Sequence, residues 1–282
     1  MCDPKTLTVV IPTYDRVELT NRAINSVSSR RPAEVGIVVV DDCGSIPYEF
    51  AAKLNIHGIS VMVLRTPFNG GPGLARRYGV ERCSGRAVAL LVSDDVYHEG
   101  WLDEGLDQLM KYRAETGGIF IAGRVQHGSA ATRLVYSLLA AIPATCRVPI
   151  SRLAVVMFNP FYTPSVILSR ELCEFSDSLR YCEDYYTNAM ALFRAKRVVL
   201  SRRSSCSLSR RPGSDQGESA NSEEMLRGEL SARWAMLLSN EVPLAYKLLV
   251  PLGVVYQFTR TFLKWFLGGW RRKKPYFFDA AT

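Results

Sequence analysis

The sequence predicts an α/β protein with a mostly parallel sheet flanked by helices, followed by a helical, amphipathic extension at the C-terminus. Short apolar runs alternate with stretches of helical periodicity over residues 7–125. Strands that alternate with helices of this length indicate parallel pairing with right-handed crossovers. Hydrophobic residues make up 48% of the 282 residues and charged residues 22%, which excludes a disordered or collagen-like chain.

The first half of the chain contains the most regular elements. Five short apolar runs rich in β-branched residues predict buried strands, at 7–12, 35–40, 59–64, 87–92 and 118–125. Three stretches with apolar residues at helical spacing predict helices, at 17–28, 73–83 and 101–112. Their alternating order is what predicts the parallel sheet.

After residue 126 the pattern becomes less regular. Helices are expected at 134–142, 183–193 and 220–240, and short strands at 165–168 and 197–200. Pro143 and Pro149 predict a connection between elements, because proline interrupts a helix. Residues 202–217 are rich in Ser, Arg, Pro and Gly, which predicts a loop.

The net charge indicates the kind of partner, and the cysteine spacing indicates the redox compartment. A formal net charge of +8 suggests an anionic partner, which leaves nucleic acid, a phosphate ligand and an acidic membrane surface open. None of the seven cysteines has CxxC spacing, so we expect reduced thiols in a cytosolic compartment. We expect neither a signal segment nor a membrane-spanning helix, since no run reaches about 18 apolar residues.

Three adjacent acidic pairs stand at the ends of predicted elements. Asp41-Asp42 and Asp94-Asp95 follow strands, and Glu183-Asp184 begins a helix. Ligands of open α/β sheets bind at the carboxyl ends of strands. Paired carboxylates repel each other, and a divalent cation that also holds substrate phosphates would offset the repulsion. The alternative is that they cap helices and form turns, but their recurrence at strand ends favours a cation site.

A glycine-rich turn at residues 69–73 (NGGPG) precedes a helix that carries Arg76 and Arg77. Backbone N–H groups of such a turn can face a phosphate, and the arginines can add positive charge. The turn matches neither the dinucleotide fingerprint nor the P-loop. Taken alone, an ordinary loop and a phosphate site remain equally open.

Four sequence blocks lie at 9–16 (VVIPTYDR), 38–45 (VVVDDCGS), 69–77 (NGGPGLARR) and 93–95 (SDD). In their order and spacing, these blocks together resemble the family 2 glycosyltransferases. Downstream, residues 175–177 and 182–185 are similar to the family's acceptor-side segment with its Glu-Asp motif. The resemblance implies the GT-A fold, a Rossmann-like, mostly parallel sheet flanked by helices.

The resemblance also implies roles for individual residues. Donor-nucleotide contacts would come from Pro12, Thr13, Tyr14, Arg16, Asp41, Asp42, Asn69, Gly70, Arg76 and Asp94. Of the first acidic pair, Asp42 rather than Asp41 would accept a hydrogen bond from the base, and Arg76 would lie near the base and ribose-phosphate. Asp95 would bind Mg²⁺ or Mn²⁺. Asp184 would be the general base, with Glu183 on the acceptor side.

The implied reaction is an inverting, metal-dependent transfer of a sugar from a nucleotide-sugar donor, expected to be a UDP-sugar. The acceptor would be a hydroxyl of a glycan or of a lipid-linked saccharide. A cation would stabilise the leaving diphosphate, and one carboxylate would remove the proton from the acceptor. The alternative is a non-catalytic relative that binds a nucleotide or a glycan.

Two departures from the family's pattern concern the metal. Val92 occupies the first position of the fuller Asp-x-Asp-Asp run, and Arg211 stands where the family often carries a histidine. Arginine cannot bind a metal, but it can contact the diphosphate. Residues 194–211 hold seven basic residues and no acidic one, which also suits a diphosphate.

The resemblance and the patterns divide the chain into three parts. We expect a donor-binding half at 1–110, an acceptor half at 111–218 and a helical extension at 219–282. Residues 241–282 carry seven basic residues against two acidic ones, a net charge of +5, and aromatic residues recur at helical spacing within them. This favours an anionic membrane surface contacted by residues 243–278, at the cytoplasmic face; the alternative is a helix packed on the catalytic domain or on a partner subunit. Nucleic acid is not expected, for lack of an aromatic and basic RNA motif, and the oligomeric state stays open.

Overall fold

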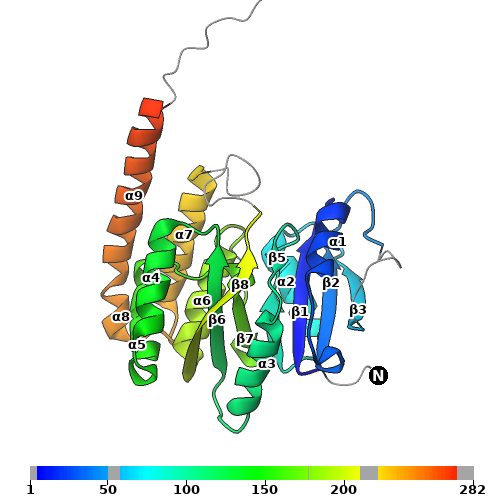
Figure 1. Ribbon diagram of the computed structural model, residues 1–282. Helices are drawn as coiled ribbons and strands as arrows, with labels where there is room; N and C mark the ends of the chain where they lie inside the picture. Colours follow the sequence, from blue (N-terminus) through cyan, green and yellow to red (C-terminus); the bar gives the residue numbers. More distant parts are fainter. Residues whose placement is uncertain (1–4, 50–57, 177, 210–221, 272–282) are drawn as a thin grey trace, which may run out of the picture.

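The computed structural model describes residues 5–49, 58–176, 178–209 and 222–271. They form an eight-stranded sheet with helices on both faces (Figure 1). The strands are β1 (Leu7–Thr13), β2 (Val35–Asp41), β3 (Ser60–Arg65), β4 (Ala87–Leu90), β5 (Val96–Tyr97), β6 (Ile119–Gln126), β7 (Val166–Ser169) and β8 (Arg197–Ser207). The helices are α1 (Val17–Asn25), α2 (Pro72–Arg82), α3 (Trp101–Lys111), α4 (Ala130–Ala141), α5 (Ala144–Met157), α6 (Glu183–Arg194), α7 (Ser222–Leu238), α8 (Leu244–Lys247) and α9 (Val250–Arg271).

The sheet has the order β3-β2-β1-β4-β7-β6-β8-β5. Strands β1 to β4 pair in parallel, and β6 pairs in parallel with β8. Strand β7 lies between β4 and β6 and runs antiparallel to both. The carboxyl ends of β1, β2, β4, β6 and β8 therefore share one edge of the sheet with the start of β7. We call this edge the carboxyl edge.

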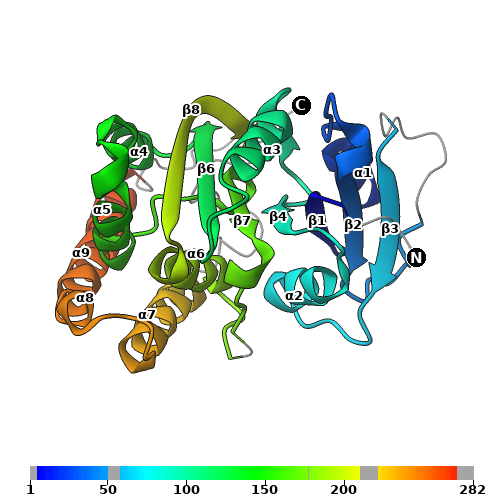
Figure 2. The same ribbon diagram turned by 90° about the horizontal axis from the view of Figure 1, so that it is seen from below.

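Alternate side chains of β1 reach two different cores. Val9 and Ile11 belong to a cluster with residues of α1 and α3, whereas Val10 packs with residues of α2. Figure 2 shows α1 and α3 on one face of the sheet and α2 on the other. The contact with α2 is close, since a Cβ added at Gly79 would lie 2.7 Å from Val10 Cγ1. All residues of β1 and β2 are buried, as expected for central parallel strands.

A third core fills the second half of the molecule. It joins β6, β7 and β8 to helices α4 to α7 and to the start of α9. The rings of Phe120 and Phe161 meet edge to face there, with centroids 5.0 Å apart. No helix among the described residues is long and apolar enough to cross a membrane.

The predicted fold class is confirmed, and most element boundaries agree within a few residues. Two expectations were wrong. Residues 202–207, expected in a loop, extend β8, because β6 and β5 offer them backbone partners on both sides. Pro149 lies inside α5, which packs against α6, α9 and β8; tertiary packing outweighs the cost of the proline there.

Candidate functional site

The Asp41 carboxylate holds together the loop that follows β2. Its Oδ1 accepts a hydrogen bond from the Gly44 N–H at 2.9 Å, and its Oδ2 accepts one from the Tyr48 N–H at 3.1 Å. Arg65, at the end of β3, donates through Nη1 to the same Oδ2 at 2.5 Å. Asp41 is buried, so these three charge-assisted bonds compensate the burial of its charge. Sequence reasoning missed Arg65, although its place at the carboxyl end of a predicted strand could have indicated it.

The Asp42 carboxylate organises the glycine-rich turn. Its Oδ1 accepts hydrogen bonds from the Gly70 N–H and the Thr66 hydroxyl, both at 3.1 Å, and its Oδ2 accepts one from the Gly71 N–H at 2.7 Å. Gly71 has a φ of +87°, which favours glycine, and a Cβ at Gly70 would lie 2.7 Å from a methyl group of Leu74. Two N–H groups that a phosphate could have used are therefore bound to Asp42.

The loop after β1 is fixed by short polar contacts. The hydroxyls of Thr13 and Thr20 lie 2.6 Å apart, and Asp15 accepts hydrogen bonds from the Ser45 hydroxyl and N–H. The hydroxyl of Ser45 is the main cause that lowers the pKa of Asp15. Tyr14 points its ring largely into solvent, with 46% of its surface exposed. Of the other predicted donor contacts, Pro12 is buried in β1 and Asn69 is exposed at the start of the glycine-rich turn.

The second acidic pair follows β4 at the carboxyl edge, and both residues are buried. Asp95 Oδ1 accepts a hydrogen bond from the Ser209 N–H at 2.9 Å, and Arg16 Nη1 lies 3.6 Å from Asp94 Oδ2. Arg22, which sequence reasoning missed, donates to the Asp94 carbonyl at 2.6 Å and to the Ser209 hydroxyl at 2.5 Å. The ends of β4 and β8 are thus held together around this pair.

The donor set at this pair fits a divalent cation that shares its coordination with a phosphate. No group of three or more His, Cys, Asp or Glu side chains suited to a metal occurs among the described residues. Mg²⁺ is commonly bound by one or two carboxylates together with substrate phosphates and water. Asp94 and Asp95 supply that number of hard oxygen ligands. Arg211, the predicted diphosphate contact, lies outside the described residues.

The third acidic pair divides into two environments at the start of α6. Glu183 is 5% exposed and forms an ion pair with Arg76 of α2, which is 4% exposed. Asp184 is half-buried; its Oδ2 accepts a hydrogen bond from the Thr163 hydroxyl at 2.8 Å, and its Oδ1 one from the Tyr185 N–H at 2.8 Å. Thr163 begins the short turn Thr163–Ser165 that leads into β7, which places Asp184 near the carboxyl edge as well.

Three of the predicted carboxylates, Asp41, Asp42 and Glu183, bind other residues of the chain. The other three lie along the carboxyl edge. Asp94, Asp95 and Asp184 are held there by β4, β8 and the start of β7. Arg76 forms its ion pair with Glu183 and joins α2 to α6, and its place near the nucleotide stays a prediction. Arg22 and Thr163 are the positioning side chains that the sequence patterns did not single out. They come from ordinary helix and loop positions that carry no motif.

Part of the chain that contains some of these residues matches a known protein family. Residues 8–140 match the family model described as glycosyl transferase family 2. The chain is thus similar to glycosyl transferase family 2 over nearly half of its length. The match contains the first two acidic pairs and the glycine-rich turn, and it ends within α4. Asp184 lies beyond it.

Two curated relatives each match a part of the chain. The chain is 33% identical over 97 residues to the pre-mycofactocin glycosyltransferase of Mycobacterium tuberculosis, which covers 34% of this chain and 19% of the relative. It is 33% identical over 118 residues to the succinoglycan biosynthesis protein ExoO of Rhizobium meliloti, covering 41% of this chain and 32% of that protein. The matched region is thus less than half of either protein.

Solved structures extend the likeness to nearly the whole chain. TarS 1–349 of S. aureus in complex with UDP-GlcNAc aligns with a TM-score of 0.63 and 18% identity, covering 96% of this chain and 76% of that one. The mannosyltransferase PcManGT from Pyrobaculum calidifontis, in complex with GDP-Man and Mn²⁺, aligns with a TM-score of 0.59 and 13% identity, covering 96% and 81%. At this level of identity the likeness shows the fold, which is the GT-A fold.

Proposed function

We propose that the chain transfers a sugar from a nucleotide-sugar donor to a hydroxyl of a glycan or of a lipid-linked saccharide, with inversion at the anomeric carbon. The observation that carries the proposal is the shared edge at which Asp94-Asp95 and Asp184 lie, in a chain whose residues 8–140 match the family model of glycosyl transferase family 2. We take a UDP-sugar as the donor; TarS, a protein of the same fold, has been solved with UDP-GlcNAc.

In this proposal residues 1–110 bind the donor. Tyr14 and Arg16 follow β1, and their partly exposed side chains are available to the nucleotide. Asp42 already accepts three hydrogen bonds from the chain. An ionised carboxylate has about four acceptor positions, so one remains for an N–H of the base.

Asp95 is the residue that we assign to Mn²⁺ or Mg²⁺. The Ser209 N–H fixes its Oδ1, which leaves the direction of its Oδ2 well defined. When bound, the cation would stabilise the negative charge that develops on the leaving diphosphate. Arg16, 3.6 Å from Asp94, adds positive charge on the same side.

Asp184 is the residue that we assign as general base. Thr163 and the Tyr185 N–H orient its carboxylate, which would take the proton from the acceptor hydroxyl as attack proceeds. The carboxylate of Glu183 is engaged by Arg76, so the pair offers a single carboxylate for proton removal. A single base that activates the acceptor hydroxyl fits a direct, inverting displacement.

The test measures donor binding and turnover separately. UDP-GlcNAc, UDP-glucose and GDP-mannose are screened by thermal shift with Mn²⁺, and UDP release is followed with a panel of oligosaccharide acceptors. We expect Asp184→Asn to lower turnover by about 10²- to 10⁴-fold while the Kd for UDP stays unchanged. Glu171→Gln, an exposed carboxylate elsewhere, serves as the control. Binding of no nucleotide would refute the donor assignment, and full turnover in Asp184→Asn would refute the base.

We further propose that α8 and α9 contact an anionic membrane at its cytoplasmic face. An exposed apolar stripe runs along them at helical spacing, formed by Leu244, Leu248, Leu252, Val255, Phe258, Phe262 and Phe266. The far end of α9 projects beyond the other elements (Figure 1). The net charge of +5 over residues 241–282 complements anionic lipids. The basic residues at 272–274 within that range lie outside the described part of the chain.

Flotation of the full chain with anionic vesicles tests the membrane proposal. We expect the triple variant Phe258→Ser/Phe262→Ser/Phe266→Ser to lose flotation, because it removes three aromatic residues of the stripe. The control variant Ile46→Ser/Phe68→Ser/Met110→Ser removes exposed apolar residues elsewhere and should float as the wild type does. Equal flotation of both variants would contradict the proposal, as would a wild type that forms a dimer through this stripe and does not float.

A further inference from the structure

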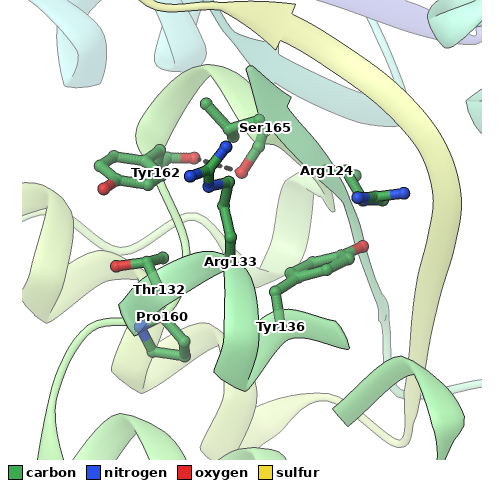
Figure 3. Close-up of a pocket in the computed structure, with 9 residues that line it drawn as sticks. Arg124, Thr132, Arg133, Tyr136, Pro160, Tyr162 and Ser165 are labelled. Atoms are coloured by element: carbon green, nitrogen blue, oxygen red, sulfur yellow. Dashed lines mark hydrogen bonds between the residues drawn. The ribbon is translucent and has the colours of Figure 1, made fainter. Parts of the chain in front are cut away.

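A pocket outside the donor site lies at the end of β6, between α4 and the segment that leads into β7 (Figure 3). It encloses about 300 Å³, counting the space open to solvent. Its polar lining comes from six residues, Arg124, Thr132, Arg133, Tyr136, Tyr162 and Ser165. None of the residues that line it is acidic.

The pocket is connected to the proposed base by adjacent residues. Tyr162 lines the pocket, and the hydroxyl of the next residue, Thr163, donates a hydrogen bond to Asp184. Strand β6, which supplies Arg124, pairs with β8, and the backbone that follows β8 binds Asp95. The pocket therefore lies at the carboxyl edge, on the acceptor side of the proposed reaction.

The two arginines at this pocket differ in their ion pairing from three arginines of α6 and β8. Arg194, Arg197 and Arg203 each pair with a glutamate. Among the described residues, Arg124 and Arg133 have no acidic partner. Both are exposed, and Figure 3 shows Arg133 reaching from α4 toward Ser165 while Arg124 lies near the Tyr136 hydroxyl.

The position of Arg133 adds a second argument. It lies in the first turn of α4, which contains no acidic residue, and the helix dipole disfavours a cation there. A bound anion would compensate both the dipole and the two guanidinium charges. The Tyr162 hydroxyl oxygen accepts a hydrogen bond from the Ser129 N–H at 3.0 Å, so its own hydrogen is available to a ligand.

We propose that this pocket binds an anionic group of the acceptor, a phosphate or a carboxylate carried by a saccharide. The guanidiniums of Arg124 and Arg133 hold the anion, and the tyrosine rings provide a surface for the sugar. The pocket thereby selects negatively charged acceptors over neutral ones of the same size. This inference rests on the proposed function, because it assigns the acceptor side of that same reaction.

The test is calorimetry on the full chain saturated with UDP and Mn²⁺, which occupies the donor site first. The probes are glucose 1-phosphate, glucuronic acid and neutral methyl glucoside. We expect at least one charged probe to bind about tenfold more tightly than the neutral one, and Arg124→Gln/Arg133→Gln to remove that difference. Preference for the phosphate or for the carboxylate probe identifies the kind of anion.

The double variant Arg86→Gln/Arg113→Gln removes two positive charges from other exposed positions and should bind all probes as the wild type does. Charged probes that bind no better than methyl glucoside, or that bind Arg124→Gln/Arg133→Gln unchanged, overturn the inference. Failure of UDP itself to bind counts against the proposed function instead. The two failures are therefore distinguishable within one experiment.

Discussion

Arg76 and Glu183 show how a pair of charges can join the two halves of the sheet. They are 107 residues apart in the chain and both are buried, and the Arg76 Nε has no hydrogen-bond partner among the described residues. A buried pair of this kind is costly to break, because the remaining charge stays in a poorly solvated place. A Cβ at Gly73 would lie 2.6 Å from the Glu183 side chain, so the two helices leave little room for rearrangement.

Replacing Glu183 with Gln should therefore lower the free energy of unfolding by about 3–5 kcal/mol, because it leaves the Arg76 charge buried without its partner. Urea denaturation measures the change. Glu81→Gln, which breaks the exposed pair of Glu81 with Arg77 on the same helix, should cost no more than about 0.5 kcal/mol. Equal losses in the two variants would show that the buried pair does not stabilise the contact between α2 and α6.

At the same scale, Asp41, Asp42 and Glu183 bind other parts of the chain, because only the folded structure brings Arg65, Gly70 and Arg76 to them. The roles of these carboxylates toward a ligand stay predictions. Asp94 and Asp95 could be predicted, since their place after a strand is itself a sequence feature. Thr163 could not, because its partner lies 21 residues away and no spacing rule links the two.

Among the elements, α3 is tied to the segment after α1 by one carboxylate. Asp103 Oδ1 accepts hydrogen bonds from the Ser29 hydroxyl at 2.7 Å and from the Arg30 N–H at 3.0 Å, and Oδ2 accepts one from Arg30 Nε at 3.2 Å. Burial by itself raises the pKa of Asp103, but the bonds from Ser29 and Arg30 outweigh it and lower the pKa below its usual value.

The pKa of Asp103 is lower in the folded protein than in the unfolded chain. The charge of Asp103 therefore contributes to the free energy of unfolding above the unfolded-state pKa, and this contribution disappears as the pH falls through the folded-state pKa. Asp103→Asn should lower the free energy of unfolding by about 2 kcal/mol at pH 7. Urea denaturation from pH 7 down to pH 3 should show the difference shrinking below about pH 4. Asp107→Asn on the same helix is the control, because Asp107 is exposed and pairs with Arg31. A difference that stays constant with pH would contradict the role of the charge.

The elements of the first half could be predicted because each has its own periodicity. Strands β1 and β2 are continuous apolar runs that are buried on both faces, and α1 and α3 carry one apolar face each. In the second half, α5 contains a proline and β8 ends in Ser and Arg residues, so their local patterns favour other structures. Contacts with residues distant in the chain determine the structure of α5 and β8, and local sequence patterns do not reveal such contacts.

For the whole molecule, the surplus of positive charge has a distribution that the sequence indicated only in part. The cluster at 194–211 was expected to face a diphosphate, yet Arg194, Arg197 and Arg203 pair with glutamates. Arg124 and Arg133, which no motif marked, line the pocket near Asp184 instead. The parallel strands determine where this chemistry can occur, because they bring the ends of β1, β4, β6 and β8 to one edge.

Calorimetric titration with UDP, in the presence and absence of Mn²⁺, tests most directly whether this edge binds a nucleotide through a cation on Asp95. For the wild type we predict binding that Mn²⁺ strengthens by about tenfold or more, because the cation links the carboxylate to the diphosphate. Asp95→Asn should lose the effect of Mn²⁺ and keep the weaker binding seen without it, whereas Asp107→Asn should behave as the wild type. A wild type that fails to bind UDP, or an Asp95→Asn variant that responds to Mn²⁺ as the wild type does, would contradict the account.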